Sequence, residues 1–88
     1  ADGIFIVDDQ FAPSVPGILA AIAKLQPGPV RFVINSHWHQ DHTGGNEALG
    51  SRGAVIVAHD NVRRRMSLPQ FIRAFAREVP AAPPAALP

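Results

Sequence analysis

The residues best suited to chemistry lie in the hexapeptide HWHQDH at positions 37–42, which places three imidazoles and one carboxylate within six residues. Imidazole and carboxylate groups are suitable ligands for zinc, manganese or iron, and thiolate ligands are excluded because the chain has no cysteine. His37 and His39 point the same way if the backbone is extended. Asp41 and His42 are adjacent and need a turn to converge. The spacing therefore predicts half of a two-metal site with the ligands His37, His39, Asp41 and His42.

The position of this hexapeptide in the chain agrees with its chemistry. It directly follows the apolar run Val30–Ile34, and active sites are commonly built at the carboxyl ends of parallel strands. Gly44 and Gly45 come next, and we expect them to supply the turn because glycine reaches backbone conformations closed to other residues. The sequence thus predicts an active-site loop at the end of a buried strand.

The elements that position this loop follow from the apolar patterns. Uninterrupted apolar runs predict strands, helical spacing predicts helices, and both kinds end at proline, glycine or aspartate. The predicted strands span residues 3–7, 30–34 and 54–58, and the predicted helices span residues 14–26, 46–49, 61–66 and 69–78. In the last of these, Phe71, Ile72 and Phe75 form an apolar stripe. Alternating strands and helices predict an α/β fold with a mostly parallel sheet and flanking helices.

With these elements in place, the motif resembles that of a known family. His37-x-His39-x-Asp41-His42 followed by Gly44-Gly45 is similar to the signature of the metallo-β-lactamase superfamily of hydrolases. The resemblance extends to three further segments in the corresponding order, at residues 7–10, 32–35 and 58–63.

The resemblance implies a four-layer αββα sandwich of two similar halves, of which this chain supplies the first. Residues 1–79 are then the N-terminal half-domain, and the proline- and alanine-rich residues 80–88 are an extended connector or a truncated end. His37 and His39 would bind the first metal, and Asp41 and His42 the second. The family takes a further His, a bridging Asp and a last His from later segments, so we expect this fragment to be inactive alone.

The resemblance also implies a mechanism for the completed protein. It would be a zinc-dependent hydrolase acting on a small-molecule substrate, with one or two zinc ions and with manganese or iron as the alternative metals. Zinc lowers the pKa of a bound water to about 7, and the resulting hydroxide attacks the substrate. Asp41 would be the catalytic residue that orients this water or accepts its proton. The sequence leaves the substrate open, because specificity lies mainly in loops.

Other residues near the predicted site have simpler interpretations. His59 could reach the metal, but a structural role is more common for such a residue. Asp8 could support a metal ligand, although acidic residues at strand ends usually cap turns, and the same holds for Asp9. Residues 63–65 are three arginines that most simply form a solvated helix face. Trp38 is directed away from its histidine neighbours and is expected to pack.

Charge and length limit the partners. The formal net charge of +1 provides no field for nucleic acid, and no segment reaches the roughly 18 apolar residues of a membrane span. The chain's compartment, cytoplasm or periplasm, stays open. A half-sandwich leaves an apolar sheet face exposed, so the alternative function is a self-associating metal-binding half-domain without catalysis, either as a symmetric homodimer or with the missing C-terminal half.

Overall fold

The computed structural model describes residues 3–88, and a three-stranded parallel sheet lies at its centre. Its strands β1 (Ile4–Val7), β2 (Val30–Ile34) and β3 (Val55–Val57) lie side by side in chain order. The final residues of the three strands are paired in register, so all three end at one edge of the sheet. The prediction of an α/β fold with a mostly parallel sheet and flanking helices is confirmed.

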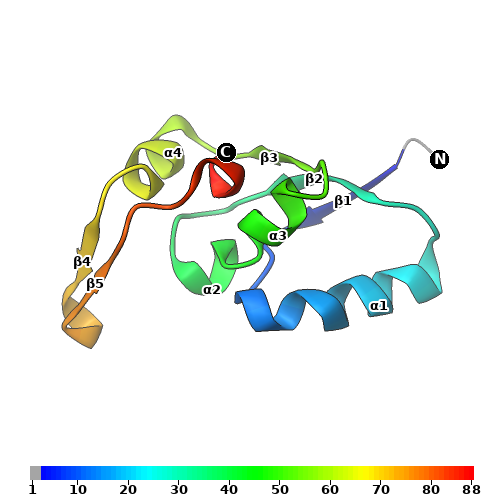
Figure 1. Cartoon of the computed structure of the whole chain (residues 1–88), viewed down its shortest axis with the longest axis horizontal. Coiled ribbons are helices and arrows are strands. Elements are labelled where there is room, and N and C mark those ends of the chain that lie inside the picture. Colours follow the sequence, from blue (N-terminus) through cyan, green and yellow to red (C-terminus); the bar gives the residue numbers. More distant parts are fainter. Residues whose placement is uncertain (1–2) are drawn as a thin grey trace.

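Two helices cover one face of this sheet (Figure 1). They are α1 (Val15–Leu25), which the short η1 (Ala12–Ser14) precedes, and α3 (Asn46–Gly50). Leu19 and Ile22 of α1 pack against the core as their helical spacing predicts, whereas Leu25 at the end of the same stripe is exposed. The buried core between helices and sheet consists of Val15, Val30, Val33, Leu49, Ala54 and Ile56.

The opposite face of the sheet carries large apolar side chains that no element covers. Side chains alternate between the two faces of a strand, so a run of apolar residues places apolar groups on both faces. This surface, here called the bare sheet face, comprises Phe5, Val7, Phe32, Ile34, Val55 and Val57, which are 38% to 63% exposed. Because parallel sheets are normally covered on both faces, the fold contains one layer of helices and one of strands where a full sandwich has more.

The helix predicted for residues 69–78 is wrong, because this segment is a β-hairpin. β4 (Gln70–Ile72) pairs antiparallel with β5 (Arg77–Val79), and η2 (Arg73–Phe75) forms the tip. Ala76 closes the turn in the left-handed conformation, with φ of 46°. Phe71 and Ile72 therefore point to opposite sides of a strand, as consecutive residues in a strand must, and do not share a helical stripe.

The tail is only partly the extended connector that its composition predicts. Residues 80–83 are extended, but η3 (Pro84–Ala86) follows and packs against α3, with Ala86 buried. The tail passes so close to Gly50 that a Cβ there would clash with the carbonyl oxygen of Ala85. Proline prevents a long helix in this segment, yet its apolar residues still gain by covering α3.

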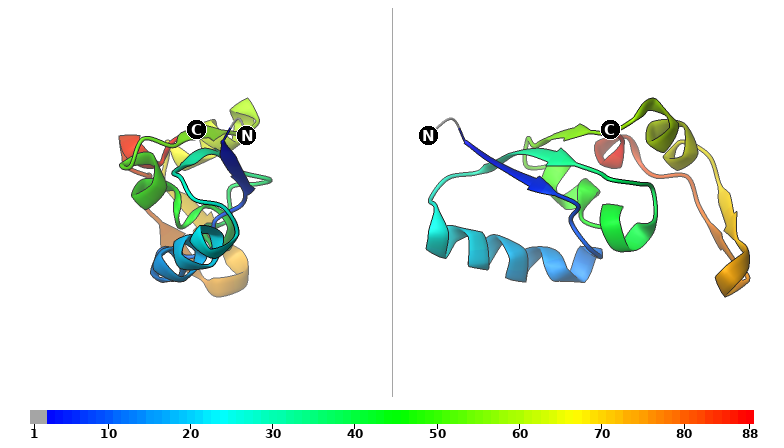
Figure 2. Two further views of the ribbon diagram at one scale, coloured as in Figure 1. Left: turned by 90° about the vertical axis from the view of Figure 1, so that its right-hand side faces the viewer. Right: turned by 180° about the vertical axis from the view of Figure 1, so that it is seen from behind.

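The remaining helices connect the sheet to the hairpin. α2 (Gln40–Thr43) follows the edge where the strands end, and α4 (Asp60–Met66) leads into the hairpin, which projects beyond α2 (Figures 1 and 2). The molecule is elongated, with principal extents of 41 × 23 × 19 Å. Among the described residues, no helix is long and apolar enough to cross a membrane.

Candidate metal centre

The carboxyl ends of β1 and β2 bring the predicted ligands together. The loop after β2 carries His37 and His39, and α2 begins directly after it with Asp41 and His42 in its short span. The hydroxyl of Thr43 donates to the backbone carbonyl of His39 at 3.2 Å, which fixes the loop against the helix. As a result the ring of His37 lies 5.0 Å from that of His39 and 4.0 Å from that of His42, measured between centroids.

Two overlapping groups of side chains could hold a metal ion. In each group, one ligand atom from every residue lies within 4.8 Å of the others. The first group is His37, His39 and Asp41, and the second is Asp8, His37 and His42. The structure therefore brings all four predicted ligands to one place. The groups differ from the predicted division into His37 with His39 and Asp41 with His42, because His37 belongs to both groups. Nitrogen and carboxylate oxygen donors in this arrangement suit zinc.

Asp8 is the residue that organises the cluster. It follows β1 and adopts the left-handed conformation, with φ of 58°, which a short polar side chain tolerates better than most. Its carboxylate accepts hydrogen bonds from the backbone N–H and the hydroxyl of Ser36, each at 2.7 Å, and from Nδ1 of His42 at 2.8 Å. The carboxylate thereby holds the loop after β2 and one predicted ligand in place, a supporting role that the sequence had only suggested.

Ser36, which the sequence reasoning missed, extends this control to His37. Its hydroxyl has one proton and donates it to the acceptor-only carboxylate of Asp8, so the contact of 2.8 Å to His37 requires a proton on Nδ1 of that histidine. Nε2 of His37 is then left with a lone pair. At His42, Nδ1 also donates to Asp8, and Nε2 faces the Asp41 carboxylate. Because Nδ1 of each imidazole is engaged in a hydrogen bond, Nε2 is the nitrogen through which each could bind a metal.

The charges in the cluster shift two pKa values in opposite directions. Partial burial raises the pKa of Asp8, but the hydrogen bonds from Ser36 and His42 outweigh it and hold the pKa below its usual value. The hydrogen bond to Asp8 raises the pKa of His42, and the nearby charge of Asp41 adds to the effect. Nε2 of His42 lies 3.3 Å from the Asp41 carboxylate. A metal at this position must therefore compete with a proton on His42.

Asp9 lies behind the cluster and is fully buried. One carboxylate oxygen accepts a hydrogen bond from the backbone N–H of Gly45 at 2.9 Å, and the other has no partner among the described residues. Burial raises the pKa of Asp9 to about 6, against the opposing effect of the Gly45 hydrogen bond. The sequence signal, an acidic residue after a strand, is the same for Asp8 and Asp9, so it could not separate these two environments.

Gly44 and Gly45 lie in the turn as predicted, but the predicted reason for glycine at these positions is wrong. Both residues have ordinary right-handed helical backbone angles, so neither uses the conformational freedom of glycine. A Cβ on Gly45 would instead lie 2.7 Å from the carbonyl oxygen of Asp9 and 2.8 Å from Val15, and one on Gly44 would lie 2.6 Å from the carbonyl of Gln10. The glycines are required because the loop after β1 packs directly on this turn.

A buried pair of amides behind the loop was also missed from the sequence. Asn35 and Asn46 exchange two side-chain hydrogen bonds, at 2.8 and 3.1 Å, and Asn46 donates a third to the carbonyl of Ala86. The pair joins the end of β2 to the start of α3 and to the tail. Buried polar groups that are satisfied in this way fix relative positions, so the amides help set the direction of the loop.

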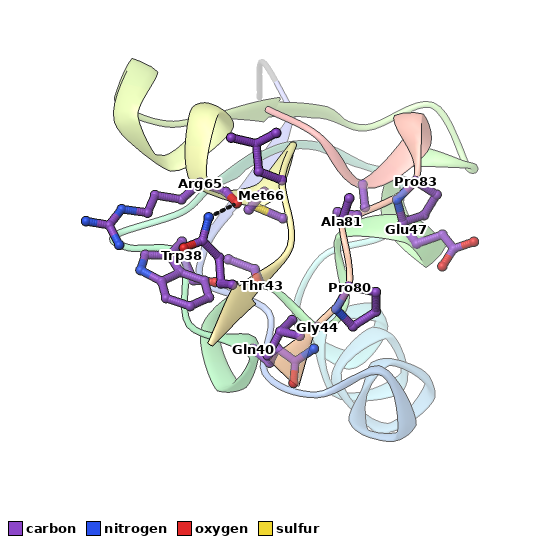
Figure 3. Close-up of a pocket in the computed structure, with 15 residues that line it drawn as sticks. Trp38, Gln40, Thr43, Gly44, Glu47, Arg65, Met66, Pro80, Ala81 and Pro83 are labelled. Carbon is purple, nitrogen blue, oxygen red and sulfur yellow. Dashed lines mark hydrogen bonds between the residues drawn. The ribbon is translucent and has the colours of Figure 1, made fainter. Parts of the chain in front are cut away.

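His59, Trp38 and the three arginines of residues 63–65 lie outside the cluster. His59 caps α4, where its Nδ1 accepts from the backbone N–H of Asn61 at 3.1 Å, and it belongs to neither candidate metal group. Trp38 lines a separate pocket of about 180 Å³ with Thr43 and Met66 (Figure 3). The three arginines of residues 63–65 are exposed, as expected.

Residues 6–86 match the family model described as the metallo-beta-lactamase superfamily. A hydroxyacylglutathione hydrolase from Polaromonas sp. (strain JS666 / ATCC BAA-500) is 38% identical over 48 residues, which are 53% of this chain and 18% of that relative. The chain thus matches less than a fifth of the relative's length. No solved structure gives a significant match.

Proposed function

Because the chain belongs to the metallo-β-lactamase superfamily, we propose that it is the first half of a zinc-dependent hydrolase whose metal ions are held by His37, His39, Asp41 and His42. The observation that carries the proposal is the convergence of two candidate ligand groups on His37, within 4.8 Å in each group. Supporting it, Ser36 and Asp8 engage Nδ1 of His37 and His42, which leaves Nε2 of each as the nitrogen for a metal. Manganese and iron are the alternative metals.

The chain's own residues have distinct tasks in this proposal. When bound, zinc would lower the pKa of a water molecule to about 7 and so supply a nucleophile at neutral pH. Asp41, whose side chain is half exposed beside His42, would orient that water or accept its proton. Asp8 would keep His42 oriented throughout. The relative is named a hydroxyacylglutathione hydrolase, and we propose a small-molecule substrate for the complete protein.

The first test is the zinc content per chain after exhaustive dialysis. We expect zinc to be retained by the unchanged chain and by His59→Ala, because His59 lies outside the cluster. His39→Ala should retain markedly less, since it removes a ligand from one group. Equal zinc in all three proteins would contradict the proposed ligands. Hydrolysis of lactam, lactone and thioester substrates by zinc-loaded protein, with and without the C-terminal half, then tests the activity.

A second candidate function is favoured by the bare sheet face. In this alternative the chain is a self-associating metal-binding half-domain without catalysis, which buries its apolar face against a second copy or against the other half of the sandwich. The native mass of the same dialysed sample separates the two. A stable dimer that retains zinc but hydrolyses nothing supports the alternative, whereas a monomer that becomes active on completion supports the hydrolase.

A further inference from the structure

A cleft of about 520 Å³ opens between the candidate metal centre and the β4–β5 hairpin. One wall contains His39 and Asp41, and the other contains Ile72 and Phe75 of the hairpin. Phe11, from the loop that follows β1, also lines the cleft. We call this space the hairpin cleft. Its size falls within the range of about 300–1,000 Å³ that is typical of small-molecule sites.

The hairpin cleft combines apolar walls with two predicted metal ligands. Phe11 and Phe75 are 53% and 75% exposed, so two aromatic rings face water across the cleft. Covering such surface is favourable, by roughly 25 cal/mol for each Å² of apolar area removed from water. An apolar ligand group lying between the rings would gain this energy while its neighbouring atoms lie against His39 and Asp41. The bare sheet face, although also apolar, has no such polar wall.

The far wall is held in place by a contact that crosses the cleft. Nη2 of Arg77 in β5 donates to the side-chain carbonyl of Gln40 in α2 at 2.7 Å. Gln40 lies between the two ligand residues of the cleft wall, so this bond sets the distance between the hairpin and the metal centre. Arg77 is a positioning residue in this respect, because it acts through Gln40 and the hairpin.

From this juxtaposition we infer that the hairpin cleft is the subsite for an apolar group of the substrate, aryl or branched alkyl, next to the bond that is hydrolysed. The inference rests on the proposed function and deepens it, because it places a specificity determinant within this half of the protein. The hairpin selects substrates by the size of that apolar group, and Phe75 is the residue that contacts it.

The test of selectivity compares two model esters, p-nitrophenyl acetate and p-nitrophenyl phenylacetate, with zinc-loaded protein that also contains the C-terminal half, because the first half is expected to be inactive alone. We expect Phe75→Ala to lower kcat/KM for the phenylacetate ester by about tenfold or more and to leave the acetate within about twofold, as expected for the loss of an apolar contact. Phe71→Ala is the matched control, because Phe71 is an exposed ring of the same hairpin that does not line the cleft. An unchanged ratio of the two esters in Phe75→Ala would overturn the inference.

A second measurement separates this inference from the proposed function. In an NMR titration of the protein with phenylacetamide, we expect amide shifts at Gln40 and Ala74 that disappear in Phe75→Ala and persist in Phe71→Ala. This readout needs neither zinc nor turnover. If the shifts are confined to Phe32 and Val57 of the bare sheet face, or if none appear at millimolar phenylacetamide, the inference that the hairpin cleft is a binding subsite is overturned. If shifts appear at the cleft but no ester is hydrolysed, the subsite stands and the hydrolase proposal fails.

Discussion

The sheet edge at which the three strands end has nearly all of its buried polar atoms hydrogen-bonded, whereas the bare sheet face lacks a covering layer. At the edge, one buried carboxylate oxygen, of Asp9, lacks a partner within residues 3–88, and the other buried side-chain polar atoms of that part are hydrogen-bonded. On the bare sheet face, six large apolar side chains stay exposed. The residues that orient the predicted ligands are therefore all present in this chain, whereas half of the apolar layer around the sheet has no cover. The chain therefore holds its predicted ligands in place without completing the apolar layers around its sheet.

The largest effect should come from disrupting the packing behind the edge. Gly45→Ala would place a Cβ within 2.7–2.9 Å of Asp9 and Val15, neither of which can move freely in the buried interior. We expect the free energy of unfolding to fall by about 1–3 kcal/mol, as is typical of overpacking, and zinc retention to fall with it. Chemical denaturation measures the first effect.

Gly17→Ala is the control for this change. Gly17 lies in α1, and an added Cβ meets no atom within 4 Å. Alanine there should stabilise the chain by up to about 1 kcal/mol through its helix propensity. If Gly45→Ala is as harmless as Gly17→Ala, the close packing of the two loops does not determine the geometry of the edge.

The next effect should appear in metal affinity without a comparable loss of stability. Asp8→Asn removes the charge that accepts from both Ser36 and His42, so His42 loses its fixed orientation. We expect zinc affinity to fall by roughly 10–100-fold, the usual range for such a supporting residue. Competition with a chelator measures it, and Glu78→Gln on the exposed side of β5 is the charge-matched control. Equal affinities of the two variants would show that the histidines are oriented without Asp8.

The comparison also explains what the sequence could predict. Apolar runs and proline or glycine boundaries gave β1, β2, β3, α1, α3 and α4 nearly at their observed limits, because local patterns determine these elements. The hairpin was not predictable in this way, since Phe71, Ile72 and Phe75 also fit helical spacing and Ala76 turns the chain without the usual glycine or asparagine. The four ligands were visible as a motif. Their support was not, because Asp8 lies 28 residues from Ser36 and 34 from His42.

A change on the bare sheet face should alter association and leave the edge intact. Phe32→Ser removes an aromatic ring from the middle strand of that face, so we expect self-association to weaken by about tenfold, which corresponds to roughly 1.4 kcal/mol. Sedimentation velocity over a range of concentrations measures this. Leu25→Ser removes an even more exposed apolar side chain, which lies at the end of α1 and away from this face, and should have no effect. Equal changes in both variants would indicate nonspecific hydrophobic contact.

The smallest effect should be a pH dependence of stability that originates at the edge. The pKa of Asp9 is about 6 in the folded chain against 3.8 for the free side chain, so Asp9 favours folding while it is protonated. This contribution is complete below pH 3.8 and is lost as the pH rises through 6, because the unfolded chain ionises first. With screening by water at the edge taken into account, the loss is about 1–2 kcal/mol. Asp9→Asn keeps an oxygen for the N–H of Gly45 and should flatten the unfolding free energy between pH 4 and pH 7, measured by denaturation. Asp8 has a lowered pKa and gives the opposite trend at acid pH. Because Asp8 is present in both the unchanged chain and Asp9→Asn, the difference between their pH profiles isolates the contribution of Asp9. The same slope in both would mean that the buried carboxylate is relaxed by solvent and that the edge is less closed than its hydrogen bonds imply.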